Sequence, residues 1–202
     1  VHSERSGYQP SYIVAARNPW SNAVIATPAA LYYEEGKSNA TAVPLLVAGA
    51  DGETQEKSVV SKGITGFISA YGGGAGALVG HLTDSDKKDL ESAGAEFNWK
   101  VTADSVKAVS IAVAEQFWKK SDAALIIKND EKGYGFGVNA LPLASYLDIP
   151  VYVVDHIDTE VKASLSKLGV KYTLLCGDVG TYGRVYPLNN HSKIWSLIAT
   201  GK

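Results

Sequence analysis

The sequence predicts an α/β fold: parallel sheets in flavodoxin- or Rossmann-like layers, built from two similar βαβαβ units. Short β-branched runs alternate with helical patterns, which is typical of right-handed βαβ connections and a mostly parallel sheet. The 202 residues have an ordinary globular composition, with 46% hydrophobic and 20% charged residues. Several segments also recur in the same order in the two halves of the chain, which indicates an internal duplication.

Six short runs rich in β-branched or aromatic residues are predicted as strands. They cover residues 12–16, 44–49, 65–71, 123–128, 149–155 and 171–177. The run 149–155, IPVYVVD, is the most typical, because a small-residue helical segment precedes it and an acidic loop follows it.

Three stretches between these strands have helical patterns. Residues 83–94 begin at a Thr cap, carry early Asp residues that suit the positive end of the helix dipole, and stop at a Gly. Residues 158–169 are capped by Asp158 or Thr159 and closed by Gly169. The longest stretch, 102–120, carries one apolar stripe made of Val106, Val109, Val113 and Phe117.

The duplication is anchored on two strands that each end in a basic residue followed by Asn. The loop after each strand contains an Asn-Ala pair. The matched segments are 12–18 with 124–129, 28–33 with 142–147, 44–47 with 150–153, and 59–74 with 164–180. Because the matches keep their order, we predict two copies of one unit, over 12–80 and 123–186, joined by the helix 102–120.

The predicted division of the chain follows these two units. It consists of an N-terminal arm (1–11), a first α/β repeat (12–100), a second α/β repeat (101–190) and a C-terminal tail (191–202). The two repeats can also form one continuous domain. The tail is fairly apolar and is expected either to pack on the core or to reach a neighbouring subunit.

The repeated unit resembles a family of cell-envelope proteins. The second copy carries NALPLASYLDIPVYVVD (139–155) and LGVKYTLLCGD (168–178), and the first carries NAVIATPAALYY (22–33), VPLLVAG (43–49) and ISAYGGG (68–74). These segments resemble two degenerate copies of the cell wall-binding repeat type 2, which is found in surface-layer and cell-wall-anchored proteins. The resemblance implies a non-catalytic, surface-located α/β module.

Polar residues follow the first strand of each unit, and they are the candidate ligand-binding residues. In a parallel sheet, ligands bind beyond the carboxyl ends of the strands. Aromatic faces, amides and cations at this place suit an anionic or neutral glycan. The predicted residues are Arg17, Asn18, Trp20 and Asn22 in the first unit, and Lys128, Asn129, Tyr134 and Asn139 in the second. The alternative is that these side chains cap strand ends and fix turns.

Several features indicate an exported protein. The chain begins at Val1 and contains no Met. This fits either a mature chain from which a signal peptide has been removed or a segment selected from a longer protein. Two Asn-x-Ser/Thr sequons predict glycosylation at Asn39, in the polar stretch 34–41, and at Asn190. A single cysteine, Cys176, excludes an intrachain disulfide and is expected to be buried and inert.

The charge and hydropathy patterns exclude two kinds of partner. A net charge of −2, with scattered Lys and Arg, gives no electrostatic case for nucleic acid. No apolar run approaches the roughly 18 residues that a membrane span needs.

A glycine-rich string supports a rival function as a nucleotide-binding or sugar-binding protein or enzyme. Within YGGGAGALVG (71–80), Gly72, Gly74 and Ala77 have the G-x-G-x-x-A spacing after a predicted strand, which suits a phosphate at a helix N-terminus. The matching segment of the second unit, CGDVGTYG, breaks that spacing. A structural tight turn is therefore the favoured interpretation.

The loop around His156 supports the same rival. His156 lies between Asp155 and Asp158, a group that suits a metal ion or a general base. The other histidines show no ligand spacing with it, and Asp158 is more simply a helix cap. The acidic residues at 84, 86 and 89 lack the glycine and terminal Glu of an EF-hand, and the capped helix accounts for them.

The sequence thus predicts a non-catalytic cell-surface protein with a structural or anchoring role. It is expected to bind an envelope glycan or polymer, or to self-assemble into a surface layer, sheath or filament. No cofactor or metal is predicted, and the predicted location is extracellular. A soluble sugar receptor with its site between the two units is a further alternative.

Overall fold

The computed structural model describes residues 1–49 and 60–189, together with Ser196 and Ala199. The first unit contains four strands and three helices in alternation. They are β2 (Ile13–Ala16), α1 (Ser21–Ala30), β5 (Leu45–Ala48), α2 (Lys62–Tyr71), β6 (Gly76–Val79), α3 (Asp84–Ser92) and β7 (Phe97–Val101). A small antiparallel ribbon of β3 (Leu31–Tyr32) and β4 (Thr41–Ala42) lies between α1 and β5.

The second unit follows helix α4 (Val106–Phe117) and has the same alternation as far as its third strand, but the chain runs from the third strand to the fourth without a helix. Its elements are β9 (Ala123–Lys128), α5 (Glu131–Leu147), β10 (Val151–Val154), α6 (Thr159–Leu168), β11 (Tyr172–Cys176) and β12 (Arg184–Pro187). The N-terminal arm contributes β1 (Ser3–Arg5), which pairs antiparallel with β8 (Trp118–Ser121).

Each unit builds a four-stranded parallel sheet, and the two sheets have the same strand order. The orders are β5-β2-β6-β7 and β10-β9-β11-β12, so that each unit places its first strand between its second and third. This is the order of the doubly wound, flavodoxin-like fold. The structure therefore confirms the predicted α/β fold built from two similar units.

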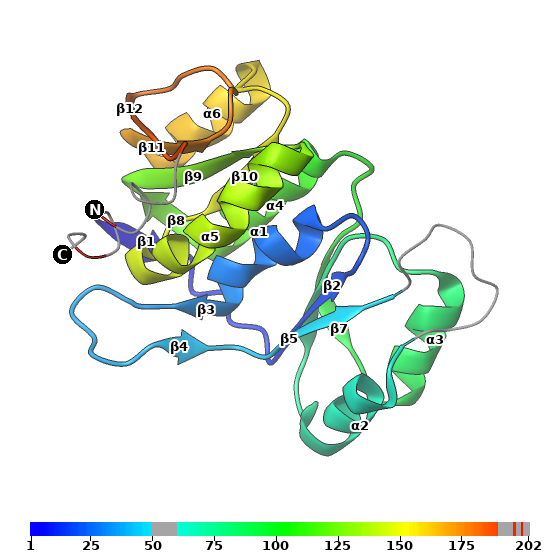
Figure 1. Ribbon diagram of the computed structural model, residues 1–202. Helices are drawn as coiled ribbons and strands as arrows, with labels where there is room; N and C mark the ends of the chain where they lie inside the picture. Colours follow the sequence, from blue (N-terminus) through cyan, green and yellow to red (C-terminus); the bar gives the residue numbers. More distant parts are fainter. Residues whose placement is uncertain (50–59, 190–195, 197–198, 200–202) are drawn as a thin grey trace.

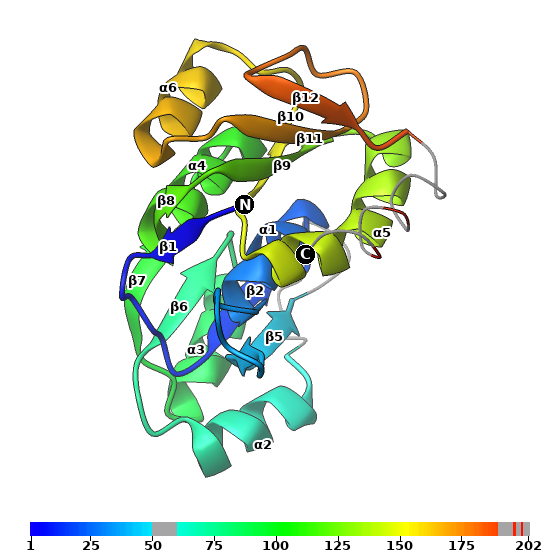
Figure 2. The ribbon, with the colours of Figure 1, turned by 90° about the vertical axis from the view of Figure 1, so that its left-hand side faces the viewer.

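Helix α1 of the first unit lies between the two sheets (Figure 1). It packs on β2 of its own sheet and also contacts α4, α5 and β10 of the second unit. Helices α2 and α3 lie on the other side of the first sheet, as both ribbon views show (Figure 2). One apolar core therefore runs through both units.

Strand β2 shows how the layers arise from the sequence. Successive side chains of a strand point to opposite faces, and here Ile13 and Ala15 join the core that both units share. Tyr12, Val14 and Ala16 instead join a second core beneath the first sheet. Because both faces are covered, the strand is apolar throughout, as expected for a parallel sheet.

Five of the six predicted strands are confirmed as β2, β5, β9, β10 and β11, but the segment 65–71 is not a strand. It belongs to α2, whose N-cap Ser61 accepts a hydrogen bond from the Ile64 amide. The aromatic and β-branched residues of this segment suggested a strand, but Ile64, Phe67 and Ile68 recur at helical spacing on the side that packs on the second core.

Two predicted loops are also helical. Helix α1 begins at Ser21, and α5 begins at Glu131 after its N-cap Asp130, so Asn22, Tyr134 and Asn139 are helical residues. In contrast, the predicted caps are confirmed: Thr83 caps α3, Asp158 caps α6, and Gly169 ends α6 in a left-handed conformation. Helix α4 is shorter than predicted, because residues 118–121 form β8.

The exact limits of the predicted repeats, 12–100 and 101–190, stay a prediction, since the shared core gives no single boundary between them. The predicted tail, 191–202, lies outside the described residues except for Ser196 and Ala199, which are helical and exposed.

Candidate functional site

The first candidate region is a hollow at the carboxyl ends of β2, β5 and β6. Its volume is about 490 Å³, which is in the range of small-molecule binding pockets. In a sheet of this strand order, the crevice between the first and third strands is the usual ligand position. The polar residues that line the hollow are Arg17, Asn18, His81, Thr83, Asp86 and Asp104.

A second, smaller hollow of about 260 Å³ lies beside the end of β10 in the second unit. Asn129 lines it, as do His156 and Asp158 from the loop after β10 and Ser105 and Lys107 at the start of α4. Of the residues predicted in the second unit to bind a ligand, Asn129 is the one that reaches this hollow.

The segment from Asp104 to Lys107 connects the two hollows. Asp104 lines the first hollow, where its carboxylate lies 3.1 Å from Nε2 of His81. Lys107 lines the second, where Nζ lies 2.7 Å from the carboxylate of Asp158 and 3.3 Å from that of Glu160. The two hollows therefore adjoin one chain segment and belong to one edge of the molecule.

The ion pair in the second hollow shifts the pKa of both partners. The hydrogen bond from Lys107 lowers the pKa of the Asp158 carboxyl, and the bond that Asp158 accepts from the Val161 amide lowers it further. The same pair raises the pKa of Lys107. Asp158 is thus both the cap of α6 and an ion-pair partner.

The structure joins the two predicted loops through Trp20 and Tyr134. Their ring centroids lie 4.7 Å apart at an interplanar angle of 59°. Trp20 is the N-cap residue of α1 and partly buried, whereas Tyr134 lies in the first turns of α5 and is 41% exposed. An aromatic side chain from each unit therefore contributes to one shared aromatic surface.

Asn22 and Asn139 have local roles. Asn22 is only 2% exposed, and its amide donates to the carbonyls of Ala16 and Asn18 at 3.3 and 3.4 Å. Asn22 therefore shapes the loop that presents Asn18. Asn139 is exposed on α5, where its amide donates to the Gly135 carbonyl at 2.8 Å.

Arg17 and Lys128 occupy matching positions, but they differ in their surroundings. Arg17 is exposed at the rim of the first hollow. Lys128 lies against Gly177, where an added Cβ would come within 2.6 Å of the Lys128 Cβ, and its Nζ donates to the Asp155 carbonyl at 3.0 Å. The crevice between β9 and β11 is thus occupied by a lysine side chain.

The glycine string, for which a structural tight turn was the favoured interpretation, does not lie where the phosphate loop of the rival function would. Gly72 ends α2, so the spaced glycines follow a helix and not a strand, and β6 begins only at Gly76. Gly72 and Gly74 therefore lie at the amino end of β6, opposite to the edge where a parallel sheet binds ligands. The glycine that matches Gly177 at the end of the third strand is Gly80, with a φ of +95°.

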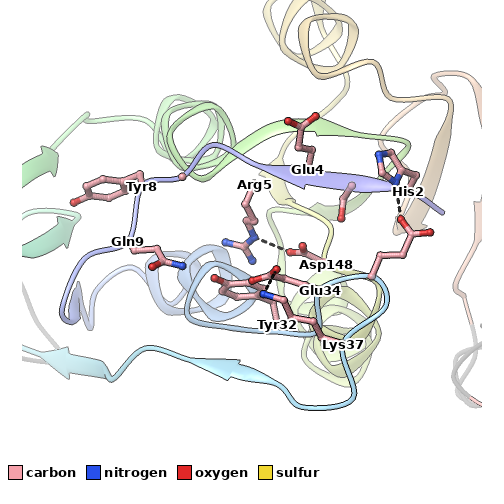
Figure 3. A pocket seen from close by; sticks show the side chains of 12 residues that line it. His2, Glu4, Arg5, Tyr8, Gln9, Tyr32, Glu34, Lys37 and Asp148 are labelled. Carbon is pink, nitrogen blue, oxygen red and sulfur yellow. Dashed lines mark hydrogen bonds and ion pairs between the residues drawn. The ribbon is translucent and has the colours of Figure 1, made fainter.

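The sequence offered no signal for a further cavity, which lies beside the N-terminal arm and has a volume of about 570 Å³ (Figure 3). Its ionisable side chains already have polar partners: Arg5 has Asp148, His2 has Glu35, Lys37 has Glu34, and Glu4 has Lys119. The cavity therefore belongs to the docking of the arm and leaves the carboxyl edges as the candidate functional site.

His81, Asp104 and Lys107 are the site residues that the sequence interpretation missed. His81 lies two residues after the end of β6, and recognition of the strand at 76–79 would have pointed to it. Lys107 is in the first turn of α4, after the cap Ser105.

Two further properties bear on the kind of site. Among the residues that the structure describes, no group of three His, Cys, Asp or Glu side chains is placed to hold a metal ion. None of the helices in the described part of the chain is long and apolar enough to cross a membrane.

No protein-family model and no curated protein matches the sequence. Among solved structures, the chain is similar to Cwp6 from Clostridium difficile, with a TM-score of 0.62 and 15% identity over 95% of this chain and 27% of that protein. It is also similar to Cwp8 from the same organism, with a TM-score of 0.60 and 13% identity over 93% of this chain and 34% of that protein. The chain thus spans about a third or less of either protein, and the likeness shows the fold.

Proposed function

We propose that this chain is a non-catalytic cell-surface module that binds an envelope glycan or polymer along the carboxyl edges of its two sheets and self-associates. We further propose that its units are degenerate members of the cell wall-binding repeat type 2 family. The likeness in fold to Cwp6 and Cwp8, which are cell wall proteins, supports an extracellular location at the envelope.

The contact between Trp20 and Tyr134 is the observation that carries the proposal. It joins the segments that follow the first strand of each unit, and one residue of each segment, Asn18 or Asn129, lines a hollow. A linear polymer can contact both hollows and the aromatic surface at once, whereas a single small ligand fills only one of them.

The side chains at the two hollows suit an anionic or neutral glycan. Asn18 and Asn129 offer amides, and Arg17 and Lys107 offer cations. The carboxylate of Asp158 lies in an ion pair with Lys107, which reduces its repulsion of an anionic ligand, and the carboxylate of Asp104 lies 3.1 Å from Nε2 of His81.

Binding to isolated envelope polymers tests this proposal. Tyr134→Ala removes the exposed ring, and we expect binding about two- to tenfold weaker, the range for a lost aromatic contact. Asn18→Ala and Asn129→Ala should each weaken binding too. Tyr71→Ala is the matched control, because Tyr71 is 74% exposed at the end of α2, away from the carboxyl edges. Equal binding of all four variants would contradict the proposal.

A small-molecule function is the second candidate, favoured by the position of the first hollow between the ends of β2 and β6. A nucleotide or sugar that raised the melting temperature of the native chain, and lost this effect in Asn18→Ala, would support it. The same assay with His156→Ala would reveal a ligand at the second hollow.

Glycosylation at Asn39 also remains a proposal. Asn39 is exposed in the loop between β3 and β4, where a modifying enzyme can reach it. Asn190 lies outside the described residues. Intact mass of the secreted protein, compared with Asn39→Gln, tests the first site.

A further inference from the structure

Each of the two hollows contains a histidine at the same local position. His81 lies two residues after the end of β6, and His156 lies two residues after the end of β10. In both segments the next residue is a buried aliphatic one, Leu82 or Ile157, and the residue after that is the N-cap of a helix. Because the aliphatic residue packs in the core, the histidine before it stays at the edge of the sheet, where it is exposed and lines its hollow.

The two histidines do not correspond in the duplication. β6 is the third strand of the first unit, whereas β10 is the second strand of the second unit. Strand β11, which matches β6, is followed by Gly177 and Asp178 and not by a histidine. The presence of one histidine in each hollow is therefore a property that the two hollows share, and not a residue copied from one unit to the other.

The charge on His81 sets the charge balance of the first hollow. Its Nε2 lies 3.1 Å from the carboxylate of Asp104. The other charged residues that line this hollow are Asp86, which is 2% exposed, and Arg17. The lining thus has two carboxylates and one permanent cation, so its charged groups sum to a negative charge when His81 is neutral and balance when His81 is protonated.

The second hollow has the same balance around His156. Its lining also contains two carboxylates and one permanent cation, namely Asp155, Asp158 and Lys107. Two further charges of opposite sign touch this set: Glu160 lies 3.3 Å from Nζ of Lys107, and Nζ of Lys128 donates to the Asp155 carbonyl. After the hydrogen bond from Lys107, a charge on His156 is a further cause that lowers the pKa of Asp158. Protonation of His156 therefore acts on the same carboxylate that Lys107 holds.

We infer that the envelope polymer of the proposed function is anionic, and that each hollow takes up a proton on its histidine when it binds a negative group of the polymer. The inference rests on the proposed function and deepens it, because that function allows a neutral glycan as well. Histidine is the side chain that ordinarily changes charge between about pH 5 and 8, and its protonation removes the excess negative charge that would repel an anion. Because the anion and the proton then favour each other's binding, affinity rises as the pH falls.

Calorimetric titration with isolated envelope polymer tests this coupling. Titrations near pH 6.5 in two buffers with different ionisation enthalpies give the number of protons taken up on binding. We expect the wild type to take up protons, and to bind at least about fivefold more tightly at about pH 5.5 than at about pH 8.

A variant with both His81→Asn and His156→Asn keeps polar side chains at the two positions but cannot gain a proton there. It should bind at both pH values with the affinity that the wild type has at about pH 8. Its remaining proton uptake comes from the polymer itself, so the difference from the wild type belongs to the two histidines. Each single variant should lose only part of that difference.

His2→Asn is the matched control, because His2 contacts Glu35 beside the N-terminal arm and lines neither hollow. It should keep the proton uptake and the pH dependence of the wild type. The side chain of His81 is 57% exposed, and His156 is exposed as well, so the substitutions should leave the melting temperature close to that of the wild type.

Chemical treatment of the polymer identifies the negative group. Hydrofluoric acid cleaves phosphodiesters, and carbodiimide coupling to a neutral amine removes the charge of carboxylates. One of the two treatments should abolish the difference in proton uptake between the wild type and the double variant.

Equal proton uptake by the wild type and the double variant overturns the inference. If the polymer then binds with the same affinity at both pH values, the ligand is a neutral glycan and the proposed function stands. If no envelope polymer binds at either pH, the proposed function is wrong, and the inference is wrong with it.

Discussion

Arg5 and Asp148 form an ion pair inside the protein: their side chains are 14% and 4% exposed, and Nε donates to Oδ1 at 2.7 Å. Burial lowers the pKa of Arg5 and raises the pKa of Asp148, and each partner opposes the shift of the other. The two charges therefore depend on each other, because neither has enough water to stabilise it alone.

Arg5→Ala should destabilise the protein by about 3–5 kcal/mol, because it leaves the Asp148 carboxylate buried without its cation. Urea unfolding followed by circular dichroism measures the change. Lys37→Ala removes the exposed ion pair with Glu34 and should leave the free energy of unfolding nearly unchanged. Equal effects of the two substitutions would show that the buried pair contributes no more than a surface pair.

The ion pair of Lys107 with Asp158 should make stability depend on pH in the acidic range. Its hydrogen bond lowers the pKa of Asp158 in the folded state, so the stabilisation is complete above the unfolded pKa of about 4 and is lost as the pH falls through the lowered value. Asp158→Asn keeps a capping side chain but loses the charge. The difference in melting temperature between the wild type and this variant should shrink from about pH 6 to about pH 3. A difference that stays constant over this range would exclude the ion pair as its source.

Gly80→Ala should be more destabilising than Gly94→Ala. Both glycines have positive φ, at +95° and +104°, so both substitutions strain the backbone. At Gly80 alone of these two, an added Cβ would lie 2.3 Å from the amide nitrogen of Asn22. We expect an extra cost of about 1–3 kcal/mol from this overlap, measured by urea unfolding. If both substitutions lowered the free energy of unfolding equally, Asn22 would have to move away from the added Cβ at little energetic cost.

The thiol of Cys176 should resist modification in the folded protein. Burial raises its pKa to about 12, and only the thiolate reacts. With a thiol reagent at about pH 8, the native chain should react slowly and the chain unfolded in guanidinium chloride rapidly. The exposed cysteine of Lys167→Cys supplies the reference for a free thiol, and a native Cys176 that reacted as fast would contradict the burial.

The sequence pattern predicted the central strands correctly for a physical reason. Strands such as β9 and β10 are covered on both faces, so their residues are uniformly apolar and stand out from the loops. β6 was not predicted as a strand because its residues, GALV, directly continue a glycine-rich run. The segment 65–71 was misassigned because composition was given more weight than the helical spacing of its apolar residues.

The start of α5 was missed because its glycines suggested a loop. An added Cβ at Gly133 would lie 2.0 Å from the Lys128 carbonyl, and one at Gly137 would lie 2.6 Å from the Ile127 side chain. These glycines let the helix approach β9 closely, which local sequence does not reveal.

The candidate site was predictable only in part. Arg17, Asn18 and Asn129 follow strands that the sequence revealed, and each lines one of the two hollows. The contact between Trp20 and Tyr134 depends on how the two units pack, and neither loop contains a signal for the other. The groups that surround Arg5, among them Tyr32, Trp118 and Asp148, could not be predicted for the same reason.

The position of Arg5 has a consequence for the order of events during synthesis. Arg5 leaves the ribosome before Asp148, which lies 143 positions later in the chain. At roughly 5–20 residues per second, Arg5 waits about 7–30 s before its ion-pair partner is synthesised. The contact that docks β1 can therefore form only late in the synthesis of these 202 residues.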